Sequence, residues 1–289
     1  MFSDLKKLQH KYLKYLQQKT LSFPRIIHIE TRSKCNGICG FCPASIFTDQ
    51  RDDVYMKDEL IQKIIEELVE LNYCNRISFY NNNEPFLDER IFQLVRFARE
   101  KLPKAYLELK SNGIILTTEK ILKIFNAGLD MLYINYYSNN SQFNQNLLDI
   151  KTDLEKIRRF KGHLEDDKYF YRIKINLRNA NKVGRSRAGN SPNKKYIDKP
   201  LHRVCFRPFE MLTVNPKGNV SVCSEDFLYE VNMGNIEKQS LSEIWNSDKW
   251  NTLRYSLIMG HRNCTGPCSK CDYIGYTYEM LMENRLYNI

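Results

Sequence analysis

The sequence predicts an α/β fold with a parallel sheet, followed by a smaller C-terminal domain held together by metal. Strand-like and helix-like segments alternate about five times between residues 26 and 180, as right-handed βαβ units do. Eight of the nine cysteines lie in two groups, one near each end of the chain. Between the groups, residues 179–203 lack periodicity, as a linker does. We therefore predict an N-terminal helix (1–24), a core domain (25–200) and a C-terminal domain (201–289).

The periodicity of apolar residues predicts each element of the core in turn. Leu5, Tyr12 and Leu16 share one stripe of a helix over residues 5–18, and the apolar run Ile26–Ile29 is typical of a buried strand. Asp88 and Thr118 are placed to cap helices that follow them. The remaining expected strands are 76–80, 106–109, 131–136 and 171–177, and the helices are 57–72, 88–98, 118–127 and 143–160.

The C-terminal domain shows a hairpin and two helices. Residues 210–214 and 219–222 flank Pro216-Lys217-Gly218, which is a turn signal. Helices are expected around 241–258 and 276–286. Cys74, which lies outside both cysteine groups, is expected to be a buried core residue.

Composition excludes several classes of protein. Of 289 residues, 42% are hydrophobic and 27% charged, which excludes collagen-like and disordered chains. No apolar run reaches about 18 residues, so no transmembrane helix and no membrane partner are expected. The charged N-terminus does not resemble a secretory signal, so we expect a cytoplasmic protein. Cytosolic disulfides are rare and nine is an odd number, so metal ligation is the better account of the cysteines.

The N-terminal cysteines have the spacing Cys35-x3-Cys39-x2-Cys42, directly after the first strand. Three thiolates can hold three irons of a cubane cluster, and full ligation takes four. One iron would then stay open to a ligand that is not protein. Structural zinc is the alternative, but it needs four ligands, and no local fourth ligand is evident.

These residues resemble the radical S-adenosylmethionine (SAM) superfamily. Its CxxxCxxC motif stands here as CNGICGFC, with the customary aromatic Phe41 before the last cysteine. After the second strand, YNNNEP (80–85) replaces the family's GGEP turn, with Asn82 and Asn83 in place of the glycines. Asn tolerates left-handed backbone better than most residues, so the turn is still feasible. Ser111-Asn112-Gly113 stands where many members have TNG, and Asn135 stands where Ser is common.

The resemblance implies a partial (β/α)6 barrel and a defined chemistry. The open iron would chelate SAM, and reductive cleavage would give a 5′-deoxyadenosyl radical that abstracts a substrate hydrogen. Glu84 would contact the SAM amino group, and Ser111 and Asn135 would lie near its ribose or carboxylate. Ordinary loop capping is the alternative for these last two. The implied partner is a flavodoxin- or ferredoxin-type electron donor. The full set of candidate SAM-binding residues is Phe41, Asn82, Asn83, Glu84, Ser111 and Asn135.

The C-terminal cysteines, with the segments MGNI (233–236) and SLSEIW (240–245), resemble the SPASM or twitch extension of radical SAM enzymes. The full extension has seven cysteines and two auxiliary clusters, so five cysteines imply one auxiliary [4Fe-4S] cluster. Because PCxxCD (267–272) matches the family's closing pair of ligands, the expected ligands are Cys205, Cys223, Cys268 and Cys271. Zinc is the competing metal. With either metal, the domain depends on it for folding.

Cys264 is left over, and three roles stay open for it. It can be a bystander, or a ligand in place of Cys268. It can also be a hydrogen donor that quenches a substrate radical from the opposite face, which would make the enzyme an epimerase. Without such a donor, electron removal through the auxiliary cluster would make it a dehydrogenase.

The net charge of +10 is concentrated in one stretch. Residues 182–203 hold seven Lys and Arg against Asp198, which is a net +6. A solvated loop is one interpretation. The other is attraction of an anionic small-molecule substrate, with Arg178, Arg185 and Arg187 as contacts at the mouth of the active site. No RNA-binding module with interleaved aromatics is evident, so nucleic acid is not an expected partner.

We therefore expect radical oxidation or epimerisation at a carbinol carbon of a small polar substrate: a sugar, an aminocyclitol or a nucleotide-linked sugar. The first alternative is a peptide or protein maturase of the SPASM class. Such relatives usually carry a leader-peptide domain and two auxiliary clusters, and neither is seen here. The second alternative is a zinc-bound module that binds RNA or protein.

Overall fold

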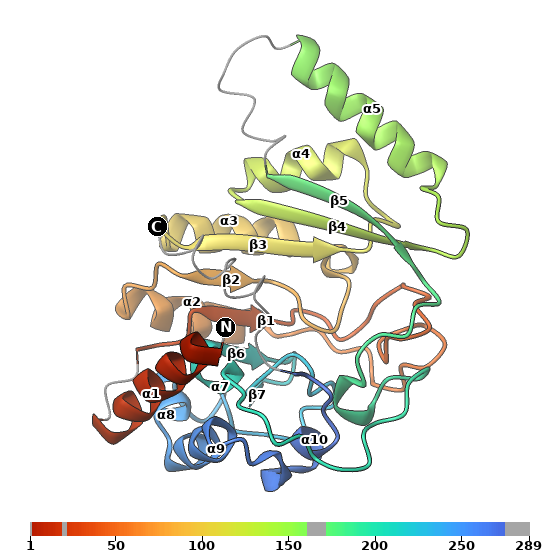
Figure 1. Cartoon of the computed structure of the whole chain (residues 1–289). Helices are drawn as coiled ribbons and strands as arrows, with labels where there is room; N and C mark the ends of the chain where they lie inside the picture. The colour runs from red at the N-terminus through yellow and green to blue at the C-terminus, as the bar shows by residue number, and fades with distance from the viewer. Residues whose placement is uncertain (1, 19–21, 161–171, 275–289) are drawn as a thin grey trace. The chain divides into compact units, whose positions relative to one another are not determined.

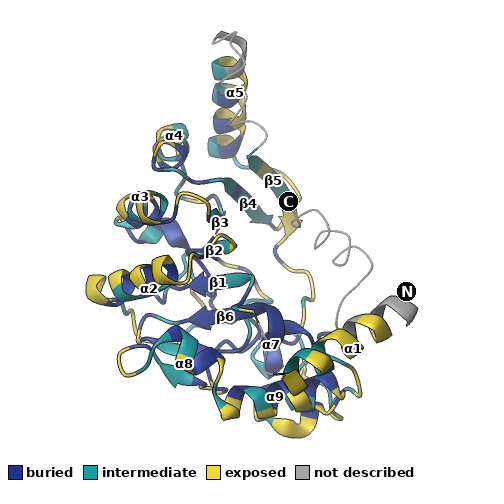
Figure 2. Ribbon diagram, turned by 90° about the vertical axis from the view of Figure 1, so that its left-hand side faces the viewer, coloured by how far each residue is buried: buried dark blue, intermediate teal, exposed yellow. Residues whose placement is uncertain are grey.

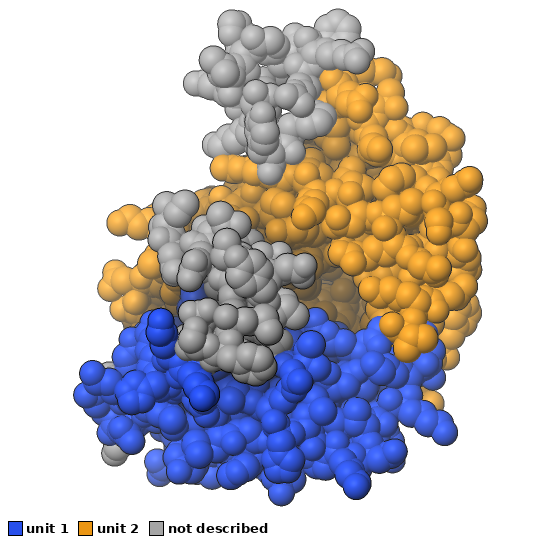
Figure 3. Space-filling view, viewed as in Figure 1, with its two compact units in different colours: residues 1–25, 184–213, 219–289 blue, residues 26–183, 214–218 orange. Residues whose placement is uncertain are grey.

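A computed structural model describes residues 2–18, 22–160 and 172–274 (Figure 1). The chain forms two compact units, coloured separately in Figure 3. Unit 2 comprises residues 26–183 and 214–218. Unit 1 comprises residues 1–25, 184–213 and 219–289. Among the described residues, no helix is long and apolar enough to cross a membrane.

Unit 2 contains a parallel sheet with the strand order β5-β4-β3-β2-β1. Helices α2 to α4 lie on one face of it (Figures 1 and 2). The backbone N–H of Glu30 also donates to the carbonyl oxygen of Val214 (2.9 Å), which attaches residues 214–218 beside β1. In chain order the elements are β1 (Ile26–Ile29), α2 (Asp58–Glu70), β2 (Arg76–Ser78), η1 (Pro85–Leu87), α3 (Ile91–Lys101), β3 (Tyr106–Ser111), α4 (Thr118–Asn126), β4 (Met131–Ser138), α5 (Gln145–Phe160) and β5 (Ile173–Asn179).

The two faces of this sheet differ in character. Ile27, Ile77 and Leu107 are paired in register and fully buried. Side chains alternate across a strand, so their neighbours, with Glu108 on β3 among them, point to the opposite face. Glu108 is buried there and accepts a hydrogen bond from the Tyr80 hydroxyl (2.7 Å). One face is therefore an apolar core against the helices, and the other carries polar groups.

Unit 1 is built from short elements around the second cysteine group. Helix α1 packs with Tyr12 and Leu16 against a cluster that includes Phe206 and Phe209. The turn between β6 and β7 has Gly218 at φ 76°, as the hairpin prediction requires. The elements are α1 (Phe2–Gln18), η2 (Arg187–Gly189), α7 (Arg207–Glu210), β6 (Met211–Val214), β7 (Asn219–Ser221), β8 (Gly234–Asn235), α8 (Leu241–Trp245), α9 (Asp248–Ile258), η3 (Arg262–Cys264) and α10 (Gly266–Ser269).

Several local predictions were wrong. The helix expected over 241–258 is two helices, because Ser247 leaves helical geometry and caps α9 through its side chain. The cap of α4 is Thr117, one residue before the predicted Thr118. Asp88 does not cap α3, which starts at Ile91 after Arg90. Cys74 is exposed rather than buried. Tyr171 and the helix expected over 276–286 lie outside the described residues.

Candidate functional site

The three N-terminal cysteines lie on the loop after β1, in unit 2. A turn brings the last two together, with the Cys42 N–H donating to the Cys39 carbonyl oxygen (3.0 Å). Burial, together with the charges of Glu84 and Cys42 at Cys35 and that of Cys42 at Cys39, raises the pKa of both thiols to about 12. Thiols that affect one another in this way share a small volume. Bound iron, which needs thiolates, would relieve the electrostatic cost.

Gly37 leaves room between two of these sulfur atoms. A Cβ placed on Gly37 would lie 3.3 Å from Cys35 Sγ and 3.9 Å from Cys39 Sγ. The loop therefore wraps closely around its own thiols, and glycine leaves free the space that a side chain would take beside these two sulfurs. This cradle fits a metal cluster that takes three protein ligands.

Glu84 is at the centre of the loops that follow β2 and β3. Its carboxylate is buried and accepts hydrogen bonds from the Ser111 hydroxyl (2.8 Å), the Asn112 N–H (2.7 Å) and the Phe86 N–H (3.2 Å). Burial raises the pKa of Glu84 to about 7, although these hydrogen bonds act in the other direction. Glu84 and Ser111, which sequence analysis assigned to SAM, thus bind each other.

Asn112 links this centre to the cysteine loop. Its side-chain Nδ2 donates to Asn36 Oδ1 (2.7 Å) and lies 3.6 Å from Cys35 Sγ. Its backbone N–H donates to the Glu84 carboxylate. One residue therefore contacts both a candidate iron ligand and the candidate SAM-binding carboxylate.

The asparagine turn at 81–83 needs no glycine. None of its residues is among the described non-glycine residues with positive φ, so left-handed backbone is not the reason that Asn is tolerated. Instead, Arg51 Nη2 donates to the Asn82 carbonyl oxygen (2.8 Å), and its Nη1 pairs with Glu30 (2.9 Å). Among the described residues, the buried Nδ2 of Asn83 has no hydrogen-bond partner, which leaves a donor for a ligand.

The remaining predicted residues of unit 2 lie on or beside β4 and β5. Asn135 Oδ1 accepts hydrogen bonds from Asn176 Nδ2 and Arg178 Nε, both at 3.1 Å. Arg178 is exposed. The Phe41 ring packs against Tyr137, with centroids 5.2 Å apart. Asn135 and Arg178 therefore form one polar pair at this end of the sheet.

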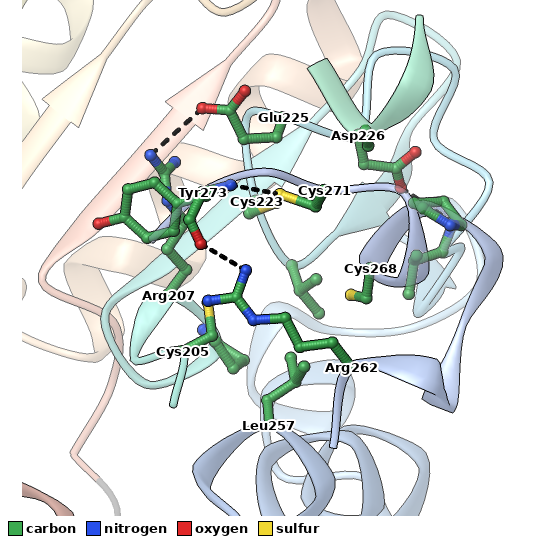
Figure 4. A pocket seen from close by; sticks show the side chains of 15 residues that line it. Cys205, Arg207, Cys223, Glu225, Asp226, Leu257, Arg262, Cys268, Cys271 and Tyr273 are labelled. Carbon is green, nitrogen blue, oxygen red and sulfur yellow. Dashed lines mark hydrogen bonds and ion pairs between the residues drawn. The ribbon is translucent and has the colours of Figure 1, made fainter. Parts of the chain in front are cut away.

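The second cysteine group lines one pocket in unit 1 (Figure 4). It brings together the four predicted ligands from separate segments: Cys205, Cys223, Cys268 and Cys271. Burial raises the pKa of Cys223 to about 12 and that of Cys271 to about 11. Among the described residues, no three Cys, His, Asp or Glu side chains converge on the position of a single metal ion. Four thiolates suit a [4Fe-4S] cluster, and they also suit one tetrahedral zinc.

Arg207 and Glu225 share this pocket with the cysteines, and Arg185 reaches Glu225 from outside the lining. Arg207 Nη2 lies 3.4 Å from Glu225 Oε1, and Arg185 Nη1 lies 2.9 Å from the same oxygen. Burial favours protonated Glu225, yet the charges of Arg187, Arg207 and Arg185 hold its pKa below the usual value. Two of the three predicted substrate-contact arginines thus act on a buried acid beside the cysteines.

Cys264 lies outside the pocket lining, next to one of its members. A hydrogen bond with Cys268 lowers the pKa of Cys264 to about 7 and raises that of Cys268 well above its usual value. Cys264 is exposed, at the end of η3. Cys264 therefore contacts one of the four pocket cysteines directly.

Two family models match the chain. The model of the radical SAM superfamily matches residues 29–168, and that of the SPASM iron-sulfur cluster-binding domain matches residues 205–272. The chain belongs to the radical SAM superfamily. The predicted family and fold are therefore confirmed, and this radical SAM enzyme has a SAM-binding [4Fe-4S] cluster and an auxiliary iron-sulfur cluster as cofactors.

The radical SAM chain is similar to characterised relatives over most of its length. It is 27% identical to the S-adenosyl-L-methionine-dependent 2-deoxy-scyllo-inosamine dehydrogenase of Niallia circulans, over 88% of this chain and 95% of that protein. It is 25% identical to BtrN, solved with AdoMet and 2-DOIA, with a TM-score of 0.72 over 88% of this chain and 95% of that one. The structure of anSMEcpe with AdoMet shares the fold at 13% identity, with a TM-score of 0.52 over 91% of this chain and 95% of that one.

Sequence reasoning on this radical SAM chain missed several residues of the pocket. Each of Arg207, Glu225 and Tyr273 stands two positions after a pocket cysteine. That repeated spacing was a usable signal. Arg262 had no comparable sequence signal.

Proposed function

We propose that the protein is a radical SAM dehydrogenase that oxidises a carbinol carbon of an aminocyclitol or a closely related polyol. The observation that carries the proposal is the likeness to 2-deoxy-scyllo-inosamine dehydrogenase over nearly the whole of both chains. A pocket lined by four cysteines supports it, because a dehydrogenase must dispose of an electron after hydrogen abstraction. When bound, SAM and the clusters supply the radical and the electron acceptor.

We assign the SAM-binding cluster to Cys35, Cys39 and Cys42, and the auxiliary cluster to the four pocket cysteines. The space that Gly37 leaves beside the sulfurs of Cys35 and Cys39 supports the first assignment. The cofactor contacts fall to the loops that Glu84 and Asn112 hold together, with the unpartnered Asn83 amide as a donor toward the SAM carboxylate.

Arg178, Arg185 and Arg187 are the proposed substrate contacts. Arg178 is exposed on β5 and held by Asn135. Arg185 is fixed by Glu225. Fixed guanidinium groups orient hydroxyl or anionic groups of a ligand, so these residues would position the substrate carbon toward the radical and help to exclude water.

The test is turnover by protein reconstituted with iron and sulfide without oxygen. With SAM and dithionite, 2-deoxy-scyllo-inosamine should lose two hydrogen atoms per molecule of 5′-deoxyadenosine, as followed by mass spectrometry. Related aminocyclitols, free sugars and nucleotide-linked sugars form the comparison panel. If SAM cleavage is stimulated by none of them, the proposed substrate class is wrong.

An epimerase is the second candidate, and the thiol of Cys264 is the observation that favours it. A hydrogen donor would return hydrogen from solvent to the substrate carbon. In D2O, an epimerase therefore yields deuterated product of unchanged oxidation level, and Cys264→Ala abolishes the label while SAM cleavage continues. Deuterium incorporation that is equal in the variant and the parent would refute the donor role.

A further inference from the structure

Arg262 is a buried cation at the wall of the auxiliary pocket. It is 2% exposed, and its guanidinium donates to three carbonyl oxygens, those of Arg203 (3.0 Å), Val204 (3.4 Å) and Tyr273. Among the carboxylates that the structure describes, none forms an ion pair with it. A charge buried in this way is costly unless an opposite charge lies close.

Arg207 lines the same pocket, but it has a carboxylate partner there. It pairs with Glu225, which Arg185 also reaches. The pocket's other carboxylate, Asp226, is occupied by the Ser221 hydroxyl (2.7 Å) and the Val231 N–H (2.9 Å). Of the two arginines in this lining, Arg262 is therefore the one without a carboxylate partner among the described residues (Figure 4).

Arg262 also supports a hydrogen bond to a cysteine sulfur. The carbonyl oxygen that it binds belongs to Tyr273, whose backbone N–H lies 3.4 Å from Cys271 Sγ (Figure 4). Hydrogen bonds to ligand sulfurs and the charge around a cluster are two of the factors that set its reduction potential. Arg262 contributes to both.

We propose that Arg262 is a positioning residue that raises the reduction potential of the auxiliary cluster. The proposal rests on the ligand set assigned above. Reduction makes a thiolate-bound cluster more negative, so a fixed cation beside it stabilises the reduced form more than the oxidised form. Arg262 should affect the potential more than Arg207 does, because Arg207 already pairs with the Glu225 carboxylate. A raised potential favours uptake of an electron, as the proposed oxidation requires.

The experiment is a redox titration of the full chain carrying Cys35→Ala, Cys39→Ala and Cys42→Ala, so that the auxiliary cluster alone gives an electron paramagnetic resonance signal. Arg262→Gln should lower the midpoint potential, with at least a tenfold change in the one-electron equilibrium, which is about 59 mV. Arg262→Lys should keep most of the potential, and Arg207→Gln should change it less than Arg262→Gln does.

Arg254→Gln is the matched control. Arg254 is another buried arginine of unit 1, stacked on Trp245 at 4.0 Å and absent from the pocket lining. Its loss tests the general effect of removing a buried arginine, and the potential should stay at the parent value.

Each outcome supports or overturns one statement. If the triple cysteine variant holds no iron, the assigned ligand set fails. If it holds about four irons and Arg262→Gln leaves the potential unchanged, the inference about Arg262 is overturned. Should Arg262→Gln fail to retain iron, Arg262→His provides the test, because a change of pH removes the charge without changing the protein. The midpoint potential of this variant must fall more than that of the parent between pH 6 and 8, as the imidazole loses its charge. An equal pH dependence of the two potentials overturns the proposal.

Discussion

Asn112 shows how one side chain can join two parts of a radical SAM site. Its amide reaches Asn36 and Cys35 on the cysteine loop, while its backbone N–H serves Glu84. The two contacts use different atoms, so a substitution can remove the first and leave the second in place. The amide is therefore a direct probe of how the cysteine loop is held.

Asn112→Ala should lower the rate of SAM cleavage about tenfold, equivalent to about 1.4 kcal/mol of activation free energy. The reason is that the cysteine loop loses its hydrogen bond from the Asn112 amide to Asn36. The rate of 5′-deoxyadenosine formation under dithionite is the measurement, with iron content as the check on cluster assembly. Asn126→Ala, at an exposed asparagine of α4, is the matched control. A rate equal to that of the control would show that the contact is incidental.

Glu84 should make stability depend on pH. Burial raises its pKa to about 7 from the usual 4.5, so the folded protein holds this proton more tightly than the unfolded chain. The resulting stabilisation is complete below about pH 4.5 and is lost as the pH rises through about 7. Glu84→Gln cannot ionise, so its stability relative to the parent should rise between about pH 4.5 and 7, by up to about 3 kcal/mol. Thermal unfolding without SAM measures this, and a constant difference between the two proteins contradicts it.

At the scale of elements, helix α1 covers the part of unit 1 that carries a proposed cluster ligand. Tyr12 packs on Phe209 with ring centroids 4.5 Å apart and on Phe206 at 5.4 Å. Phe206 directly follows Cys205 in the chain. The helix thus contributes aromatic packing beside the cysteine rather than a ligand of its own.

Tyr12→Ala should destabilise unit 1 by about 2–4 kcal/mol, because a large aromatic group leaves a partly buried site. Tyr12→Phe should cost about 1 kcal/mol, since it loses only the hydroxyl bond to Glu210 (3.2 Å). The measurement is iron retention and unfolding as denaturant is raised. If both variants behave alike, the ring does not support the cysteine segment.

Periodicity predicted the elements of unit 2 well, because a sheet covered on one face by helices imposes regular apolar spacing on both. Ile26–Ile29 begins and ends as expected. Prediction failed where a single polar contact determines where a helix begins. Ser247 is the example, because its side chain caps a new helix inside an apparently continuous apolar pattern. Cysteine spacing likewise predicted which thiols gather in each unit. Arg262 could not be found, because its position depends on carbonyl groups distant in the sequence.

On the scale of the whole molecule, each unit carries its own set of cysteines. The three near the N-terminus belong to unit 2, and the four pocket cysteines belong to unit 1. No ligand set is divided between the units. Loss of one cluster should therefore leave the other able to assemble, and the two steps of the proposed reaction become separable by mutation.

Cys268→Ala combined with Cys271→Ala should reduce iron from about eight to about four per chain and abolish the oxidised product. SAM cleavage should continue, because the three cysteines that hold its cluster lie on the other unit.

The reciprocal variant, Cys35→Ala with Cys39→Ala and Cys42→Ala, should lose SAM cleavage and keep about four irons. Cys74→Ala is the matched control: Cys74 is exposed and lies outside both cysteine groups, so its loss should leave iron, cleavage and product unchanged. If the first variant still forms the oxidised product, the auxiliary cluster is not the electron acceptor, and the proposed dehydrogenase mechanism fails even though the enzyme remains a radical SAM protein.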